Sequence, residues 1–303
     1  MRKRRKQCYS GVGGQAVLEG IMMKNKNKYA VAVRKEDGEI AVETGTYDGV
    51  LGDSKVMKIP FIRGFFTFID SLVLGMRALN KSAEYYDDEE ETKDDSKNQL
   101  SAIFTTVFAI AIALVIFVGI PYFVADAMKI WVRNTSLLAL LEGILRIVLF
   151  IGYVAGISLM KDIKRVYMYH GAEHKCINCI ERGLELNVEN VSKCSREHKR
   201  CGTSFMLYVM LISVVLFFFI RVDALWLRLA LRILLIPVVA GISYEWIRFA
   251  GSHDGVVSRA MSYLGLKLQG LTTREPDKDM MEVAIAAVEA VFDWKAYQQQ
   301  NEL

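Results

Sequence analysis

The sequence has little of two features that mark common classes of protein: net charge and histidine. Its 303 residues carry 38 Lys and Arg against 34 Asp and Glu, and this net charge of +4 is too small to indicate a nucleic-acid partner. No apolar segment with a cleavage site follows the basic residues 1–6, so we expect no cleavable signal peptide. Histidine occurs only four times, which restricts where a histidine-based site can form.

Long apolar runs are the dominant feature of what is present. Apolar residues make up 52% of the chain, and the mean hydropathy of +0.23 is high for a soluble protein. Four runs each hold about 18 or more mostly apolar residues, enough to cross a hydrocarbon core of about 30 Å. The sequence therefore predicts a mainly α, polytopic membrane protein. The predicted transmembrane helices cover residues 100–124, 137–160, 203–220 and 225–247.

The distribution of basic residues predicts the orientation in the membrane. The first inter-span loop has only Lys129 and Arg133, whereas residues 161–202 between the second and third spans are rich in Lys and Arg. The positive-inside rule then places residues 161–202, predicted as a basic loop, in the cytosol. With four spans, both termini are cytosolic as well. We expect a multi-pass protein of the bacterial cell (inner) membrane whose partner is the lipid bilayer.

The segments outside the spans are shorter and more polar. Residues 1–60 are predicted as a small cytosolic β unit, with strands at 15–24 and 29–34 and a turn at Asp37-Gly38 that makes a β-hairpin. The other predictions are an interfacial or packed helix at 61–84, an acidic disordered linker at 85–99, and a cytosolic C-terminal tail at 248–303 with an amphipathic helix at about 278–294.

Two of the four histidines fall in one pentapeptide, His170-Gly-Ala-Glu173-His174. Histidines four residues apart share one face of a helix, and the carboxylate beside the second completes H-x-x-E-H, the inverted form of the zinc-protease motif. In that chemistry two imidazoles hold the metal and the glutamate acts as base. We therefore predict that His170 and His174 bind a divalent metal, most simply zinc, and that Glu173 is the catalytic base. The third ligand is predicted among His198, Glu245 and His253.

Two other interpretations of this region stay open. The spacing of four cysteines resembles that of a zinc finger, which would be a closed structural zinc or thiol site. Alternatively the histidines pair with carboxylates, and the cysteines are small buried hydrophobes. The similarity to inverted zinc proteases covers five residues only, so it supports the roles of these residues and not peptidase activity. The four cysteines are Cys176, Cys179, Cys194 and Cys201.

Charged residues also fall inside the predicted spans. Glu142 and Arg146 lie four apart in the second span, and Arg228 and Arg232 repeat that spacing in the fourth. Ionisable groups at membrane depth are costly and usually face a partner or a polar cavity. The simpler interpretation is that Glu142 neutralises an arginine across the bundle. The functional alternative is a non-enzymatic assembly factor or a transporter-like protein whose charged helix faces line a polar path.

Several longer segments of the chain form specific motifs: GGQAVLEG (13–20), YHGAEHK (169–175), ENV (189–191), HxRCGT (198–203), GISYE (241–245) and LTTREP (271–276). With these segments the chain resembles the YqhQ-like family of uncharacterised bacterial membrane proteins, which are described as predicted metal-dependent enzymes. The resemblance implies a metal site without a defined substrate. It also implies that His198 and Cys201 belong to the family pattern, whereas Cys176 and Cys179 do not.

These observations lead to one main functional hypothesis. The chain is expected to be a metal-dependent hydrolase whose site lies at the cytosolic membrane surface, acting on a peptide or lipid-derived substrate. The alternative is the non-enzymatic membrane protein, in which the His/Cys cluster is structural.

Overall fold

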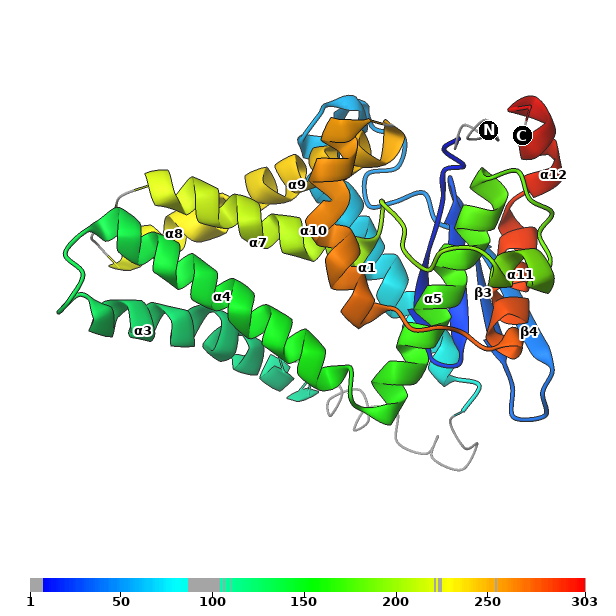
Figure 1. Ribbon diagram of the computed structural model, residues 1–303, viewed down its shortest axis with the longest axis horizontal. Helices are drawn as coiled ribbons and strands as arrows, with labels where there is room; N and C mark the ends of the chain where they lie inside the picture. The colour runs from blue at the N-terminus through cyan, green and yellow to red at the C-terminus, as the bar shows by residue number, and fades with distance from the viewer. Residues whose placement is uncertain are drawn as a thin grey trace.

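In the computed structural model, a bundle of long helices lies beside a smaller part built on a β-sheet (Figure 1). The structure describes residues 8–86, 104–105, 107–109, 111–220, 222, 225–253 and 255–302. The predicted acidic linker at 85–99 lies outside the described residues from residue 87 onward.

The sheet has four antiparallel strands in the order β1-β2-β3-β4, so the predicted hairpin is part of a larger unit. The predicted single strand at 15–24 is wrong, because the chain reverses at Leu18 and Glu19, and Glu19 takes a left-handed φ of 46°. Two residues suffice for this turn because Val17 pairs directly with Gly20. The strands are β1 (Val12–Val17), β2 (Gly20–Asn25), β3 (Lys28–Arg34) and β4 (Ile40–Thr46).

Both faces of the sheet are covered by helices. Successive strand residues point to opposite faces, so Ile21 and Met23 pack with α5 (Lys161–Glu181) and α11 (Lys278–Val291). Met22 and Val31 pack on the other face with the C-terminal half of α1 (Ile62–Ala83). This double burial explains why β2 and β3 are apolar almost without alternation.

Helix α5 makes up half of the inter-span segment 161–202, which the sequence predicted as a basic loop. The helix is polar in composition but buried on its sheet side. Close packing depends on Gly171, where a Cβ atom would lie 2.1 Å from the backbone oxygen of Arg274. The short α6 (Val188–Ser192) follows it.

Four helical stretches are long and apolar enough to cross a membrane, as predicted. They are Val107–Met128, Thr135–Ile157, Gly202–Phe219 and Ala230–Ser252. The helical segment that holds the fourth stretch begins at Leu225, the predicted start. It is divided at Leu235, where Pro237 at the start of the next segment removes a backbone donor. The elements are a π-helical turn (Val115–Gly119), α3 (Ile120–Met128), α4 (Thr135–Ile157), α7 (Gly202–Phe219), α8 (Leu225–Leu234) and α9 (Ile236–Ser252).

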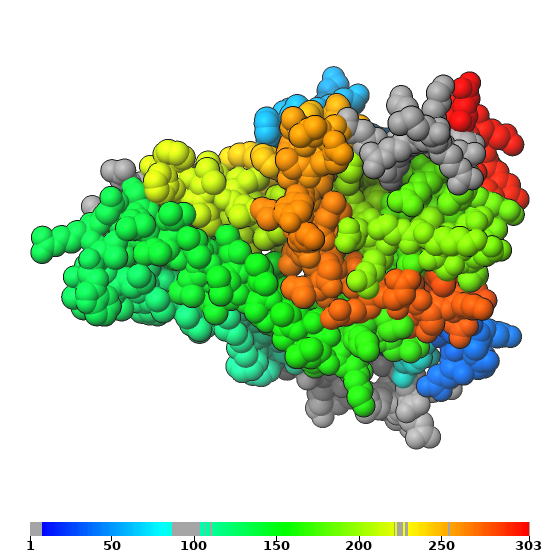
Figure 2. Space-filling model, in the orientation of Figure 1, coloured from blue at the N-terminus to red at the C-terminus, as the bar shows by residue number. Residues whose placement is uncertain are grey.

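Two helices, α1 and α10 (Val256–Thr272), run across the end of the bundle between it and the sheet (Figures 1 and 2). The start of α1 packs closely on α9, because a Cβ atom on Gly241 would lie 2.3 Å from the Phe61 backbone oxygen. The chain ends with α11, which confirms the predicted C-terminal helix, and α12 (Trp294–Gln300). A 3₁₀ turn (Lys55–Lys58) precedes α1.

Candidate metal centre

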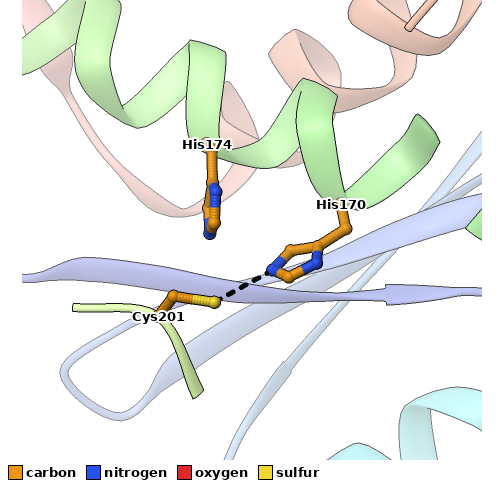
Figure 3. Close-up of side chains that lie close together, drawn as sticks. All are labelled: His170, His174 and Cys201. Carbon is orange, nitrogen blue, oxygen red and sulfur yellow. Dashed lines mark hydrogen bonds between the residues drawn. The ribbon is translucent and has the colours of Figure 1, made fainter. Parts of the chain in front are cut away.

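The buried site lies where α5 meets the start of α7. His170 and His174 lie on the same face of α5, and both side chains point toward Cys201, the residue that precedes α7 (Figure 3). The Cys201 Sγ lies 3.2 Å from His170 Nε2. One ligand atom from each of these three residues lies within 4.8 Å of the others, so the group could hold a metal ion.

The outer nitrogens of both imidazoles are fixed by backbone carbonyls. The Nδ1 of His170 lies 2.8 Å from the Thr272 oxygen, and the Nδ1 of His174 lies 2.6 Å from the Arg196 oxygen. A carbonyl can only accept a hydrogen bond, so each Nδ1 carries a proton, and each Nε2 has a free lone pair when the imidazole is neutral. Histidines that bind metals are usually oriented in this way.

The electrostatics of the cluster favour a thiolate. Burial opposes ionisation of Cys201, but His170 and His174 outweigh it and hold the pKa of this thiol well below its ordinary value. Burial likewise opposes protonation of His170, but the Cys201 sulfur outweighs it and raises the pKa of His170 to about 9. The thiolate is the form of cysteine that binds metals.

Glu173 lies beside the three ligand-type residues. Its Oε2 is 3.9 Å from His170 Nε2, and burial raises the pKa of the carboxyl group above its ordinary value. Gly14 on β1 permits this placement, since a Cβ atom there would lie 3.0 Å from Glu173 Cγ. Part of the glycine-rich segment at 13–20 therefore has a packing role next to the site. Glu19 contacts Arg165 and Tyr169 of α5 rather than the histidines.

Gln269 supports the site, and sequence reasoning missed it. The fully buried side-chain amide of Gln269 accepts a 2.8 Å hydrogen bond from the backbone N–H of His198. It also donates a 2.8 Å hydrogen bond to the backbone carbonyl of His198. It donates another, of 2.9 Å, to Ser204 Oγ. Gln269 thus clamps the segment that carries Cys201. The sequence offers only a glutamine in a helix of mixed polarity as a signal.

The other candidates for the third ligand are not members of this group. The His198 ring lies 5.7 Å from the His174 ring between centroids, but its Nε2 is 3.6 Å from the fully buried carboxylate of Glu181, which also pairs with Arg200. Glu245 binds Arg63 through both oxygens at 2.6 Å, and the exposed His253 contacts Ser252. Cys201, predicted only as part of a cysteine site, takes the place beside His170 and His174.

The structure does not bring the four cysteines together as a zinc finger would require. Cys176, Cys179 and Cys194 belong to the apolar core around α5, whereas Cys201 faces the histidines. Cys179 and Cys194 donate weak hydrogen bonds to the backbone oxygens of Glu185 and Asn190. All five cysteines of the chain that the structure describes are free thiols. All three are buried, and a side-chain hydrogen bond joins Cys179 to Cys194.

The charges in the bundle form a separate cluster. Glu142 Oε1 accepts hydrogen bonds from Arg146 at 2.9 Å and from Arg232 at 2.7 Å. The contact with Arg232 is the pairing across the bundle that the sequence suggested. The side chain of Arg228 lies outside the described part of the structure.

Comparisons with known proteins agree with the similarity seen in the sequence motifs. No solved structure matches the chain. It is 36% identical over 302 residues to "Uncharacterized protein YqhQ" of Bacillus subtilis (strain 168), a match that covers 96% of this chain and 95% of the relative. Residues 59–294 match the family model described as "Protein of unknown function (DUF1385)". The chain belongs to this family, whose YqhQ-like members share nearly its whole length.

Proposed function

We propose that the protein is a metal-dependent hydrolase in which His170, His174 and Cys201 hold the metal. The observation that supports this is the convergence of two imidazole Nε2 atoms and one sulfur, with both Nδ1 atoms bonded to carbonyls. Two nitrogens and a sulfur suit zinc, and three protein ligands are typical of its catalytic sites. A zinc ion held there would supply Lewis-acid activation of water.

In this proposal Glu173 moves the proton. Its buried carboxyl group lies next to His170, and burial raises its pKa, which favours a carboxylate that can accept a proton from water and return it to a leaving group. Gln269 and the two backbone carbonyls hold the geometry. Burial excludes bulk water, since Cys201 and Glu173 are each only 5% exposed.

We place the site at the membrane surface. Cys201 immediately precedes α7, which is long and apolar enough to cross a membrane. The basic residues between the second and third spans favour the cytosolic side. A peptide or lipid-derived substrate at the interface would reach this position.

The second candidate function is a structural metal centre in a non-enzymatic membrane protein. Its support is the enclosure of the site, where the His170 side chain is 13% exposed. A metal there would join α5 to the start of α7, and so the sheet to the bundle.

One experiment separates the two functions. The purified full chain is analysed for zinc by mass spectrometry and tested for hydrolysis of p-nitrophenyl esters, beside Glu173→Gln and the control Glu189→Gln on the exposed surface of α6. The hydrolase predicts zinc in all three proteins and hydrolysis lost only in Glu173→Gln. A structural centre predicts zinc without Glu173-dependent hydrolysis, and unfolding when zinc is removed. Absence of zinc from the wild-type protein contradicts both.

A further inference from the structure

The charged cluster inside the bundle has one positive charge that no described side chain neutralises. Glu142 is shared by Arg146 and Arg232, so one carboxylate faces two guanidinium groups. The nearby Asp126 pairs with Lys129, and these two charges cancel. Because a buried charge is costly without a partner, an arginine left unbalanced among the described residues can take an anion as its partner.

Arg146 is accounted for by the fold. Pro121 has no backbone N–H, so the Phe117 carbonyl lacks its ordinary helical donor. Arg146 Nε donates a 3.0 Å hydrogen bond to that carbonyl, and its Nη2 donates to Glu142. Arg146 therefore replaces the missing backbone donor in the helix before α3, and its charge is paired with that of Glu142.

Arg232 is not accounted for in the same way. Its Nη2 contacts Glu142 and its guanidinium carbon lies 5.3 Å from the centre of the Phe217 ring, but its Nε and Nη1 are buried without a hydrogen-bond partner among the described residues. Ser136, only 4% exposed, also has a hydroxyl group without a described partner. Both residues line one cavity of about 80 Å³, room for a small ion or several water molecules. Two residues that line this cavity thus carry three N–H groups and one O–H group without a described partner.

The position and walls of the cavity indicate the kind of anion. The cavity lies at the end of the bundle remote from the sheet, between the end of α3, the start of α4 and the end of α7 (Figure 1). Lys129 and Thr135 lie at the helix ends, and Phe217, Phe218 and Leu231 provide apolar walls. The helix ends of a membrane protein lie at the depth of lipid headgroups. A planar guanidinium group suits an oxyanion such as phosphate.

We propose that this cavity binds one phosphate group, with Arg232 and Ser136 as its hydrogen-bond donors. The phosphate belongs either to the headgroup of an anionic lipid or to an ion in solution. The site is independent of the metal centre, which lies at the other end of α7.

The test uses the detergent-purified full chain and two probes, dioctanoyl phosphatidylglycerol and inorganic phosphate, in calorimetric titrations. We expect Arg232→Met to weaken binding at least 10-fold. Arg232→Lys keeps the positive charge but not the planar set of N–H donors of the guanidinium group, so it should weaken binding less. The control Arg248→Met removes an exposed arginine near the other end of α9 and should leave binding unchanged. If the lipid binds saturably and inorganic phosphate does not bind, the site is assigned to a lipid headgroup. If inorganic phosphate binds and displaces the lipid, the site is assigned to the free ion.

A second variant keeps the test decisive if Arg232→Met fails to fold. Glu142→Gln removes the competing carboxylate, so anion binding should become several-fold tighter even if stability falls. A purely structural cluster predicts no gain in affinity from this change. Equal affinity in the wild type and all variants, or no binding of either probe by the wild type, overturns the proposal.

Discussion

Two of the buried polar clusters in the described part of the structure lie at opposite ends of α7 and differ in which groups they leave open. At the start of α7, His170, His174 and Cys201 converge, and carbonyls hold both Nδ1 atoms, so each neutral imidazole presents the electron pair of its Nε2. Near the end of α7, Arg232 and Ser136 carry N–H and O–H groups without partners among the described residues. Groups that donate electron pairs suit a cation, and groups that donate protons suit an anion. The two sites are both buried, and they differ in whether their open groups donate electron pairs or hydrogen bonds.

The strongest test of this difference removes a ligand from the first cluster. Cys201→Ser or His174→Ala should lower zinc affinity by more than ~100-fold, beyond the ~10–100-fold typical of losing an outer partner of a ligand. Arg232→Met should leave zinc affinity unchanged, because it lies in the other cluster. Competition with a fluorescent zinc chelator measures both. Equal loss of zinc in Arg232→Met would mean that the clusters are not independent.

Packing near the two clusters should also respond differently to added volume. Gly171→Ala places a Cβ atom 2.1 Å from a backbone oxygen that cannot move aside, so we expect a loss of about 3 kcal/mol in stability. Gly143→Ala in the bundle meets a Val214 methyl group at 2.4 Å, and a side chain can adjust, so about 1 kcal/mol is expected.

The matched control for both changes is Gly270→Ala on α10, which meets nothing within 4 Å. It should be neutral or stabilise by up to about 1 kcal/mol. Thermal unfolding in detergent ranks the three proteins. If Gly171→Ala is as stable as Gly270→Ala, the close approach of α5 to Arg274 is refuted.

The sheet side should carry a pH dependence that one substitution removes. Burial alone would raise the pKa of Glu181, but hydrogen bonding to His198 and the charge of Arg200 lower it to about 2. A carboxyl pKa that falls from 4.5 to about 2 on folding stabilises the protein by about 3 kcal/mol above pH 4.5. That stability is lost as the pH falls from 4.5 towards 2.

Glu181→Gln should therefore reduce stability at neutral pH and flatten the profile between pH 4.5 and 2, whereas Glu189→Gln should keep it. Chemical unfolding at a series of pH values measures this. An unchanged acid limb in Glu181→Gln would assign the dependence to other carboxylates.

The smallest expected effect concerns the hydrogen bond from Arg146 to the Phe117 carbonyl in the bundle. Pro121→Ala supplies the N–H that the Phe117 carbonyl lacks, so Arg146→Met should cost less in that background. A coupling of about 1 kcal/mol is expected for a hydrogen bond inside a bundle. A double-mutant cycle of thermal stabilities gives this value. Strict additivity would show that Arg146 does not replace the missing donor.

Parts of the fold were predictable because their signals are local. Continuous apolar runs identified the four long helices, and the strand predicted at 29–34 is β3. The reversal at Leu18-Glu19 was missed, because neither residue is a typical turn former and Glu19 adopts a positive φ. The spacing of His170 and His174 indicated a helix locally, but the extent of α5 was not predicted, because distant segments such as the sheet and α11 bury its polar residues.

In the candidate site, too, local spacing was predictable and long-range contacts were not. The spacing of His170 and His174 placed both on one helix face, and Glu173 came with them. The third member could not be chosen among His198, Glu245 and His253, because the choice depends on which distant segment folds against α5. Gln269 holds the segment that brings Cys201 there, and Arg63 binds Glu245 elsewhere.

By itself the sequence determined the class of the protein, its apolar helices and the helix-spaced ligand pair, since each follows from neighbours along one chain. Only the tertiary structure decided that Cys201 joins the histidines, that Cys176 and Cys179 are core, and that Arg232 is left with unpaired donors. Those outcomes depend on contacts between residues far apart in sequence, where backbone approach at glycines such as Gly171 and competition among buried partners select one arrangement.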